Sequence, residues 1–508
     1  MKTTTITTTI AGIATAAALP LIAADNPKSP IQNPKSLNVI FFLADDMGYG
    51  DLAKWGSPQI AGRMASEGIR IDQFYVMSPI CSASRTGLTT GTYPQRWGIT
   101  SFLAFARDNA NRGMANYLTL KAPTLAHCLQ NAGYATGHFG KWHMGGQRDV
   151  GDAPLITQYG FDESLTQFEG LGDRILPQFS PDYNPKWNNG KDNLGVLSEK
   201  LGRGKCTWVP RWKETAIFID RAITFIEKAK KEGKPFYVNI WPDDVHAPHE
   251  PSADNRGGQS PTARGAGRET AYYGGVMKEF DVEFGRLMEY IRNDPDLRDN
   301  TIVIYASDNG APKSPEQAGS NGHLRGFKGQ IYEGGFREPF IVWCPKLTNP
   351  DRVGKINTTS VIAGIDLAPT LLSILGIPVP DTVHFDGLDM SDVYLGRSTA
   401  PYRPAPVCWS RPPGAGPGTP DFAIRDGKWK LLVNGDKTTE LYDLDTDPSE
   451  TKNLSKANPQ VVKDLSAKLS AWQKTVNYEK VPATGGGGAG KAGKKGKAAR
   501  PESTDDEG

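Results

Sequence analysis

Short apolar runs of strand length alternate with longer amphipathic stretches through most of the chain. Five apolar runs lead directly into polar loops, and these runs are residues 37–43, 68–76, 133–140, 235–242 and 301–307. Between them, residues 213–230 and 272–292 repeat apolar positions with the i, i+3, i+4 spacing of a buried helix face. This alternation predicts an α/β fold with a large, mostly parallel sheet sandwiched by helices. Ligands in such folds bind beyond the carboxyl ends of the strands, where all five polar loops fall.

The pattern changes after residues 362–375, which read as a helix. Residues 421–435 and 438–448 then indicate short antiparallel strands, and a helix is expected near residues 459–476. We therefore expect a small C-terminal α+β subdomain with a short antiparallel sheet, over residues 401–480.

We expect the larger domain over residues 25–400. The two ends of the chain have a different composition. Lys2 and the mostly apolar residues 10–24 are typical of an export signal peptide, which we place at residues 1–24. The protein is thus expected in the periplasm or outside the cell, with an uncleaved membrane anchor as the alternative. No later run has 18 uncharged apolar residues, so no membrane span is expected in the mature chain. Residues 481–508 are of low complexity and are expected to be disordered.

The amino-acid composition excludes some classes of function but does not identify one. The 508 residues are 38% hydrophobic and carry a formal net charge of only +2, and no basic helix with interleaved aromatics appears, so nucleic acid is not an expected partner. Five cysteines occur without a CxxC pair, and an odd number leaves at least one unpaired. The pairing of Cys128, Cys206, Cys344 and Cys408 stays open.

Two pairs of oxygen-bearing residues follow strands. Asp45 and Asp46 come after the first strand, and Asp308 and Asn309 after the fifth. Carboxylate and amide oxygens suit calcium or magnesium, and calcium tolerates the irregular cage that two distant loops would make. Either pair alone would suit an ordinary turn or cap, but two pairs meeting at one sheet edge favour a metal site.

A second group is cationic: Lys141, His143, His246 and Lys328. Cations around a phosphate or sulfate ester stabilise charge on its peripheral oxygens, and histidines exchange protons near neutral pH. Such residues are commonly solvated surface groups. Here they lie in or beside loops that contain Gly or Pro, which favours a functional role.

Cys81 begins a helix in "CSASR", with Arg85 one turn later on the same face. A thiolate nucleophile would suit a helix N-terminus. Hard cations bind thiolate poorly, however, so a cysteine beside a calcium-type cage is a mismatch unless the cysteine is modified.

With these residues in place, the chain resembles the formylglycine-dependent sulfatases of the alkaline phosphatase-like superfamily. "CSASR" resembles the family motif Cys-x-Pro/Ala-x-Arg, with Ala83 where many members have proline. The resemblance runs from about residue 37 to about residue 455 through, in order, "ADDMGYGDL", "TGTYPQR", "GKWHMG", "SDNGAP", "FKGQIYEGGFREP", "IDLAPTLL" and "DGKWKLL".

The resemblance implies that Cys81 is converted to 3-oxoalanine (formylglycine) by a sulfatase-maturating enzyme, and that its hydrate supplies an oxygen nucleophile. The metal ligands it implies, for one Ca²⁺ ion, are Asp45, Asp46, Asp308, Asn309 and the modified Cys81. Its catalytic pattern assigns Arg85 and Lys141 to stabilising the diol and His143 to assisting its collapse. The same pattern has His246 and Lys328 bind the sulfate and assist the leaving oxygen.

His249 is the alternative to His246 as the acid, or a substrate contact. Trp409 and Arg411 are expected to close one side of the pocket and to bind substrate. Residues 172–213 carry many cations among Trp187, Trp208 and Trp212, and this segment is either a carbohydrate-binding surface or an ordinary insertion.

The expected substrate is a sulfated carbohydrate. The alternative is a phosphonate or phosphate monoester hydrolase on the same fold, although only seven histidines occur and the oxygen cage is unlike a zinc site. A non-catalytic sugar-binding relative is disfavoured by the intact set of catalytic candidates. The sugar, the sulfate position and exo or endo action stay open.

Overall fold

An eight-stranded sheet organises the chain in the computed structural model, which describes residues 37–313, 318–413, 419–435 and 438–476. Strand β9 runs antiparallel to β2 and β8, and every other neighbouring pair is parallel. The strands in spatial order are β10 (Ile356–Ala363), β2 (Ile69–Tyr75), β9 (Arg337–Trp343), β8 (Thr301–Ser307), β1 (Asn38–Ala44), β7 (Phe236–Trp241), β3 (Ala135–Gly140) and β4 (Glu163–Leu165). This arrangement confirms the predicted α/β fold with a mostly parallel sheet.

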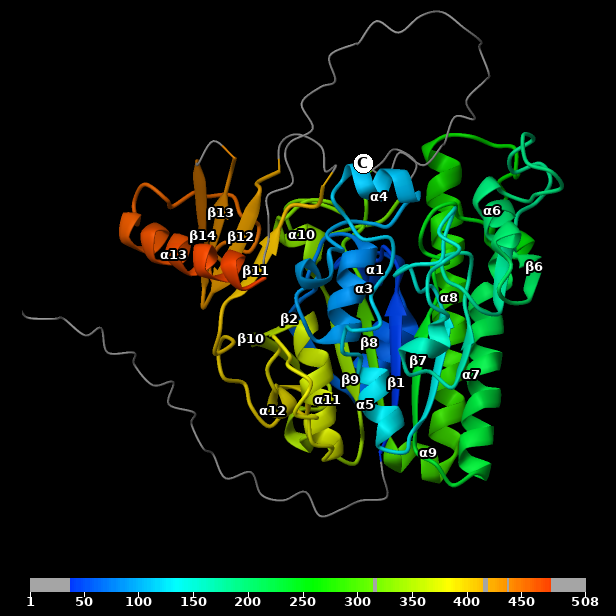
Figure 1. Ribbon diagram of the computed structural model, residues 1–508, viewed down its shortest axis with the longest axis horizontal. Helices are drawn as coiled ribbons and strands as arrows, with labels where there is room; N and C mark the ends of the chain where they lie inside the picture. Colours follow the sequence, from blue (N-terminus) through cyan, green and yellow to red (C-terminus); the bar gives the residue numbers. More distant parts are fainter. Residues whose placement is uncertain (1–36, 314–317, 414–418, 436–437, 477–508) are drawn as a thin grey trace, which may run out of the picture. The chain divides into compact units, whose positions relative to one another are not determined.

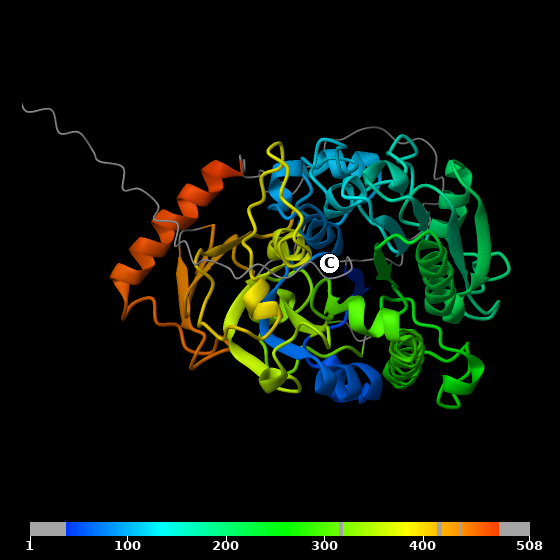
Figure 2. The same cartoon turned by 90° about the horizontal axis from the view of Figure 1, so that it is seen from below.

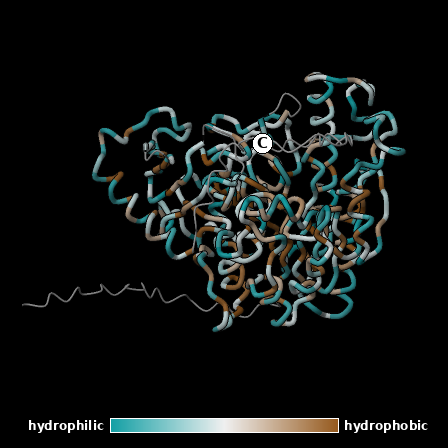
Figure 3. Tube along the Cα trace, turned by 45° about the horizontal axis from the view of Figure 1, so that its top comes forward, coloured by the Kyte–Doolittle hydropathy of each residue, from teal (hydrophilic) through white to brown (hydrophobic). Residues whose placement is uncertain are grey.

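The central strand β1 shows why the sheet is covered on both faces. Val39, Phe41 and Leu43 pack into one core, while Ile40 and Phe42 pack into the other. Successive side chains of a strand point to opposite faces, so an uninterrupted apolar run needs cover on each side. Figure 3 shows the hydrophobic segments gathered towards the inside of the trace.

Helices from different parts of the chain supply that cover (Figure 1). Long helices α7 and α8 line one face, and α3, α5 and α11 line the other. The α-helices are α1 (Asp51–Trp55), α2 (Ala65–Glu67), α3 (Cys81–Thr90), α4 (Ala106–Asn111), α5 (Leu125–Asn131), α6 (Asn193–Leu201), α7 (Glu214–Lys231), α8 (Ala266–Asn293), α9 (Pro295–Asn300), α10 (Glu333–Phe336), α11 (Leu367–Leu375), α12 (Ser391–Tyr394) and α13 (Pro459–Thr475).

A second, antiparallel sheet follows the order β11 (Val407–Ser410), β12 (Phe422–Asp426), β13 (Trp429–Val433) and β14 (Thr439–Asp443). Helix α13 packs against β12 and β13 (Figure 2). The small antiparallel sheet and its helix were predicted, whereas the boundary near residue 400 stays a prediction.

One detail differs from the sequence expectation. The segment 362–375 begins as the end of β10 and turns through a 3₁₀ helix (Gly364–Asp366) before α11 starts. Its first residues continue a β-branched run that pairs with β2, so sheet pairing overrides the helical pattern. Segment 172–213 contains β5 (Arg174–Gln178) and β6 (Cys206–Pro210), a parallel pair, with α6 between them.

Other expectations concern the chain ends and the cysteines. The predicted signal peptide and the predicted tail lie outside the described residues. No helix in the described part of the chain is long and apolar enough to cross a membrane. No disulfide joins any of the five cysteines, all of which lie in the described part of the chain.

A buried ionic cluster joins the two sheets. Lys430 of β13 is fully buried, with Nζ 3.0 Å from Glu333 Oε1 and 2.8 Å from Glu450 Oε1. Burial raises the pKa of Glu450 to about 7, although Lys430 opposes that rise. Close by, the Trp409 ring stacks on Phe336 with centroids 4.4 Å apart.

Removing Lys430 should therefore destabilise the protein strongly. Lys430→Ala removes the cation that lies between two buried carboxylates and leaves Glu333 with Arg337 as its remaining ion-pair partner, and we expect it to lower the free energy of unfolding by about 3–5 kcal/mol. Lys428→Ala is the matched control, because its half-exposed side chain makes only a surface ion pair with Asp443, which contributes little to stability. Urea unfolding of both variants measures the difference, and equal midpoints would contradict the assignment.

Candidate active site

Two neighbouring parallel strands bring the oxygen-bearing residues together. Strands β1 and β8 are paired in register up to Ala44 and Ser307, so the loops that follow them start side by side. The backbone N–H of Asp46 donates to Asp308 Oδ1 at 3.2 Å, and Asn309 Nδ2 donates to Asp46 Oδ1 at 2.7 Å. The residues predicted as two separate pairs thus form one cluster.

Arg85 neutralises the centre of this cluster. Helix α3 starts at Cys81, and Arg85 reaches back from its second turn, with Nε and Nη2 at 2.9 and 2.7 Å from Asp308 Oδ2. Its Nη2 also lies 3.6 Å from Asp45 Oδ2, and its side chain is fully buried. The guanidinium group is planar and its N–H donors point in fixed directions, so carboxylates at its edge hold it in one orientation.

Lys141 and His143 enter from the loop after β3. Lys141 Nζ lies 2.7 Å from Asp45 Oδ2, and its carbonyl accepts a hydrogen bond of 3.0 Å from Arg85. His143 Nδ1 lies 3.2 Å from Cys81 Sγ. This contact places the predicted nucleophile position and the predicted proton-transfer group within reach of each other.

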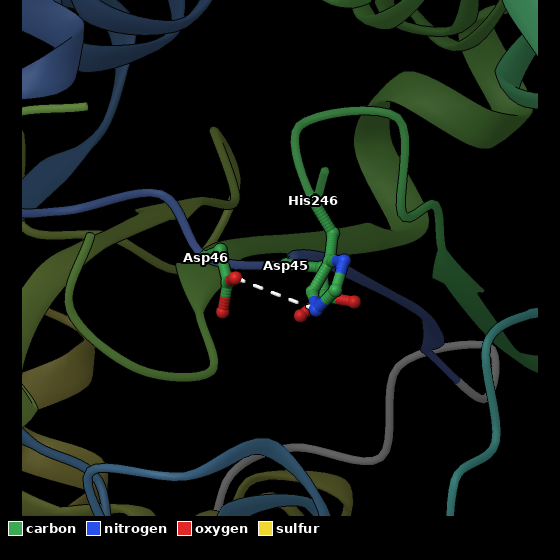
Figure 4. A group of neighbouring side chains, drawn as sticks. All are labelled: Asp45, Asp46 and His246. Carbon is green, nitrogen blue, oxygen red and sulfur yellow. Dashed lines mark ion pairs between the residues drawn. The ribbon is translucent and has the colours of Figure 1, made fainter. Parts of the chain in front are cut away.

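His246 and Lys328 complete the cluster from the side nearer to solvent. Lys328 Nζ donates to Asp46 Oδ2 at 3.0 Å and lies 3.3 Å from His246 Nε2. His246 Nε2 is 3.5 Å from Asp46 Oδ2, and Figure 4 marks this ion pair with a dashed line. The His246 side chain is 18% exposed, compared with 3% for Lys141, so His246 is the more accessible group.

The charges shift one another's protonation. Burial by itself would raise the pKa of Asp45, but Lys141 and Arg85 hold it well below its ordinary range. Burial, together with the neighbouring Asp45, raises the pKa of Asp308 to about 7 although Arg85 opposes this. Burial disfavours a charged His246, yet Asp46 raises its pKa to about 9. The cations thus keep Asp45 ionised, whereas burial and the neighbouring carboxylates favour a protonated Asp308.

The donor atoms fit a hard cation. Asp45 Oδ1 and Asn309 Oδ1 are buried without a hydrogen-bond partner among the residues that the structure describes. Buried polar atoms are nearly always paired, so two unpaired oxygens in one cluster point to a ligand. Oxygen-only donors match calcium better than zinc.

Comparisons with known proteins identify the family of the chain. The sulfatase family model matches residues 37–377, and the model described as N-sulphoglucosamine sulphohydrolase, C-terminal, matches residues 325–475. The chain belongs to the sulfatase family. As an enzyme it is a sulfuric ester hydrolase.

Relatives of this sulfatase include N-acetylgalactosamine-6-O-sulfatase of Bacteroides thetaiotaomicron, 28% identical over 87% of this chain and 94% of the relative. Arylsulfatase A of Homo sapiens is 30% identical over 84% of this chain and 86% of the relative. Among solved structures, Ps i-CgsB in complex with k-i-k-neocarrahexaose is 25% identical with a TM-score of 0.68, covering 86% of this chain and 92% of that chain.

The remaining candidates of the sulfatase fall outside the cluster. His249 is buried, with Nε2 2.8 Å from the Val245 carbonyl and its ring edge-on to Tyr273, so the geometry favours His246 as the acid. Trp409 has no exposed surface, and its Nε1 donates to the Val76 carbonyl. It therefore packs in the core instead of contacting a substrate as expected. Arg411 is one-third exposed and pairs with Asp421 at 2.8 Å.

The tryptophans of segment 172–213 have separate partners. Trp187 stacks on Tyr183 with centroids 5.8 Å apart, and Trp208 donates to Glu199. Trp212 is 40% exposed. The described contacts do not gather the three rings into one platform, so a carbohydrate surface here stays a prediction.

Sequence reasoning missed two groups that support the site. Glu169 contacts Lys141 and His143, and nothing in "FEG" marked it. Arg211 donates to the carbonyls of Asp243 and His246 and thereby anchors the loop that carries His246. Both act across a long sequence separation, for which a local motif gives no signal.

The two histidines should differ sharply when they are replaced. His246→Ala removes a group at the mouth of the cluster, and we expect kcat/KM for a sulfate ester to fall by about 10²–10⁴-fold. His249→Gln keeps a polar side chain against Val245 and should lose less than about tenfold. Steady-state kinetics on both variants decide between them. A larger loss for His249→Gln would reverse the assignment of the acid.

Proposed function

We propose that this sulfatase hydrolyses sulfate esters of a sulfated carbohydrate, with Cys81 oxidised to formylglycine and one bound Ca²⁺. The observation that carries the proposal is the position of Cys81. It starts α3, contacts His143 at 3.2 Å, and shares its helix with Arg85, which reaches both Asp45 and Asp308. An unmodified thiol would be a poor neighbour for hard-cation ligands, whereas an aldehyde hydrate is an oxygen donor.

Asp45, Asp46, Asp308 and Asn309 would hold the ion, and residue 81 would face it. The ion, when bound, supplies positive charge that favours ionised oxygen at the reacting centre. Arg85 and Lys141, both buried against Asp45, add fixed positive charge. His143 is placed to accept a proton from residue 81, since its Nδ1 is already within contact of that side chain.

His246 and Lys328 fit the other end of the reaction. Both lie on the more accessible side, and both are cationic or can become so. In this proposal Lys328 binds the sulfate oxygens, and His246 gives its proton to the departing alcohol oxygen. A leaving alkoxide is strongly basic, so protonation as the bond breaks lowers the barrier.

The substrate class rests on the relatives. One acts, by its name, on N-acetylgalactosamine 6-sulfate groups, and the solved structure of Ps i-CgsB holds a neocarrahexaose. Both names support a sulfated carbohydrate for this chain. The alternative remains a phosphonate or phosphate monoester hydrolase on the same fold, for which a matched phosphate ester is the discriminating substrate.

The proposal includes a place and a partner. Residues 1–24 would direct export to the periplasm or the outside of the cell. A formylglycine-generating enzyme would act on the "CSASR" segment, which must be reached before folding because Cys81 is fully buried in the folded chain.

Oxidation of Cys81 is directly measurable. Conversion of the thiol to an aldehyde lowers the peptide mass by roughly 18 Da, and active preparations should show this loss at position 81. Cys81→Ala should be inactive, since alanine offers no nucleophile.

A matched sulfate and phosphate ester pair should show a wide preference for the sulfate. Full activity with unmodified Cys81 would refute the mechanism, and a phosphate preference would favour the alternative.

Calcium binding should be visible without any activity measurement. A ligand that binds only the folded state raises its stability by RT ln(1 + [L]/Kd), so Ca²⁺ at about 100 times Kd adds roughly 2.7 kcal/mol. We expect calcium to raise the Tm of the chelator-treated protein and Asp45→Asn to reduce this shift. Asp220→Asn, on a highly exposed side chain, is the control and should keep the full shift. An unchanged shift in Asp45→Asn would remove Asp45 from the ligand set.

A further inference from the structure

Glu169 lies beside the catalytic candidates and has no role in the chemistry proposed above. It follows β4 in the chain and is 4% exposed. Its carbonyl accepts a 2.8 Å hydrogen bond from the backbone N–H of His143, and its own N–H donates to Gln167 Oε1. The main chain of Glu169 is thus attached directly to the loop that carries His143.

Its carboxylate bridges two cationic side chains. Glu169 Oε2 lies 3.2 Å from Lys141 Nζ and 3.0 Å from His143 Nδ1. The other oxygen, Oε1, is 3.8 Å from an Arg148 nitrogen. One oxygen therefore fixes the distance between the two groups that flank residue 81.

The ring of His143 needs such a partner. Its Nε2 lies 3.1 Å from the Leu103 carbonyl, which only accepts hydrogen bonds. Nε2 therefore donates to Leu103, and Nδ1 is the acceptor of the neutral ring. The Glu169 carboxylate, which only accepts, holds the ring through Nδ1 once that atom carries the proton taken from residue 81. A histidine that exchanges a proton with residue 81 must keep this orientation, because proton transfer requires hydrogen-bond geometry.

Lys141 also needs the Glu169 carboxylate, but for a different reason. A lysine side chain is long and flexible, and one carboxylate partner leaves its ammonium group free to swing. Asp45 at 2.7 Å and Glu169 at 3.2 Å hold the same Nζ from two directions. The ammonium group is thereby held between Asp45 and Glu169.

We propose that Glu169 is a positioning residue of this sulfatase, which orients His143 and fixes Lys141 through a single bridging carboxylate oxygen. The inference rests on the proposed function, because it assigns Glu169 to the two residues that would act on residue 81. A purely structural role is the rival explanation. Both side chains that Glu169 Oε2 contacts belong to the proposed reaction, so the geometry favours positioning.

Glu169→Gln is the decisive variant, because it keeps the size of the side chain and removes its charge. We expect kcat to fall by about 10–100-fold, the usual effect of losing a partner that orients a catalytic ligand. KM should change by less than about threefold, since Lys328 and His246 remain to bind the sulfate. Glu169→Asp, shorter by one methylene, should recover part of the loss.

Glu163→Gln is the matched control. Glu163 lies in β4 and also bridges two cations, Arg221 at 3.0 Å and Lys228 at 2.7 Å, but at the surface. The same substitution there should leave kcat and KM unchanged. Thermal unfolding of both variants separates loss of fold from loss of turnover.

A double substitution tests the route of the effect. In a His143→Ala background the loss caused by Glu169→Gln should shrink, because residues that act through one contact are not additive. Losses that multiply fully, or a Glu169→Gln enzyme with wild-type kcat, would overturn the inference. The proposed function fails separately, if active wild-type protein carries unmodified Cys81.

Discussion

The burial of Arg85 against Asp308 and Asp45 is the interaction on which the rest of the site depends. A fully buried guanidinium is tolerated only with carboxylates close to it, and those carboxylates are themselves raised or lowered in pKa by their neighbours. These ion pairs link the loop after β1, the loop after β8 and the helix that begins with Cys81. They thereby hold a charged cluster together at the edge of a sheet whose strands are apolar.

The sheet makes this assembly possible. Strands β1, β2, β3, β7 and β8 run parallel to one another, so the loops after them open at one edge. That part could be predicted from the sequence, because an apolar run ending in Asp45–Asp46 or Asp308–Asn309 carries its own signal. Hydrophobic runs determine where the strands lie, and the end of each strand determines where the polar residues directly after it lie.

Other parts of the structure gave no local signal in the sequence. Trp409 was assigned to the pocket, yet its ring stacks on Phe336 and its indole N–H is used by Val76. The small sheet that carries it is joined to the main sheet by buried charge at Lys430, and no periodicity reports such a pairing. Glu169 was missed for the same reason, because its partners lie more than 20 residues away and only the folded loops bring them together. Local patterns thus find the groups that follow strands, and miss the groups that hold them in place.

The access side of the cluster has a consequence for substrate recognition. Cys81 and Lys141 are almost completely buried, and exposure rises towards Lys328 and His246. In the proposed reaction the ester must enter with its sulfate first, so the rest of the substrate extends past His246. Arg211 ties that loop to the end of segment 172–213 through the His246 carbonyl. The side chain of Arg211 therefore connects the residues next to β6 to the loop that carries His246, which is the acid in the proposed reaction.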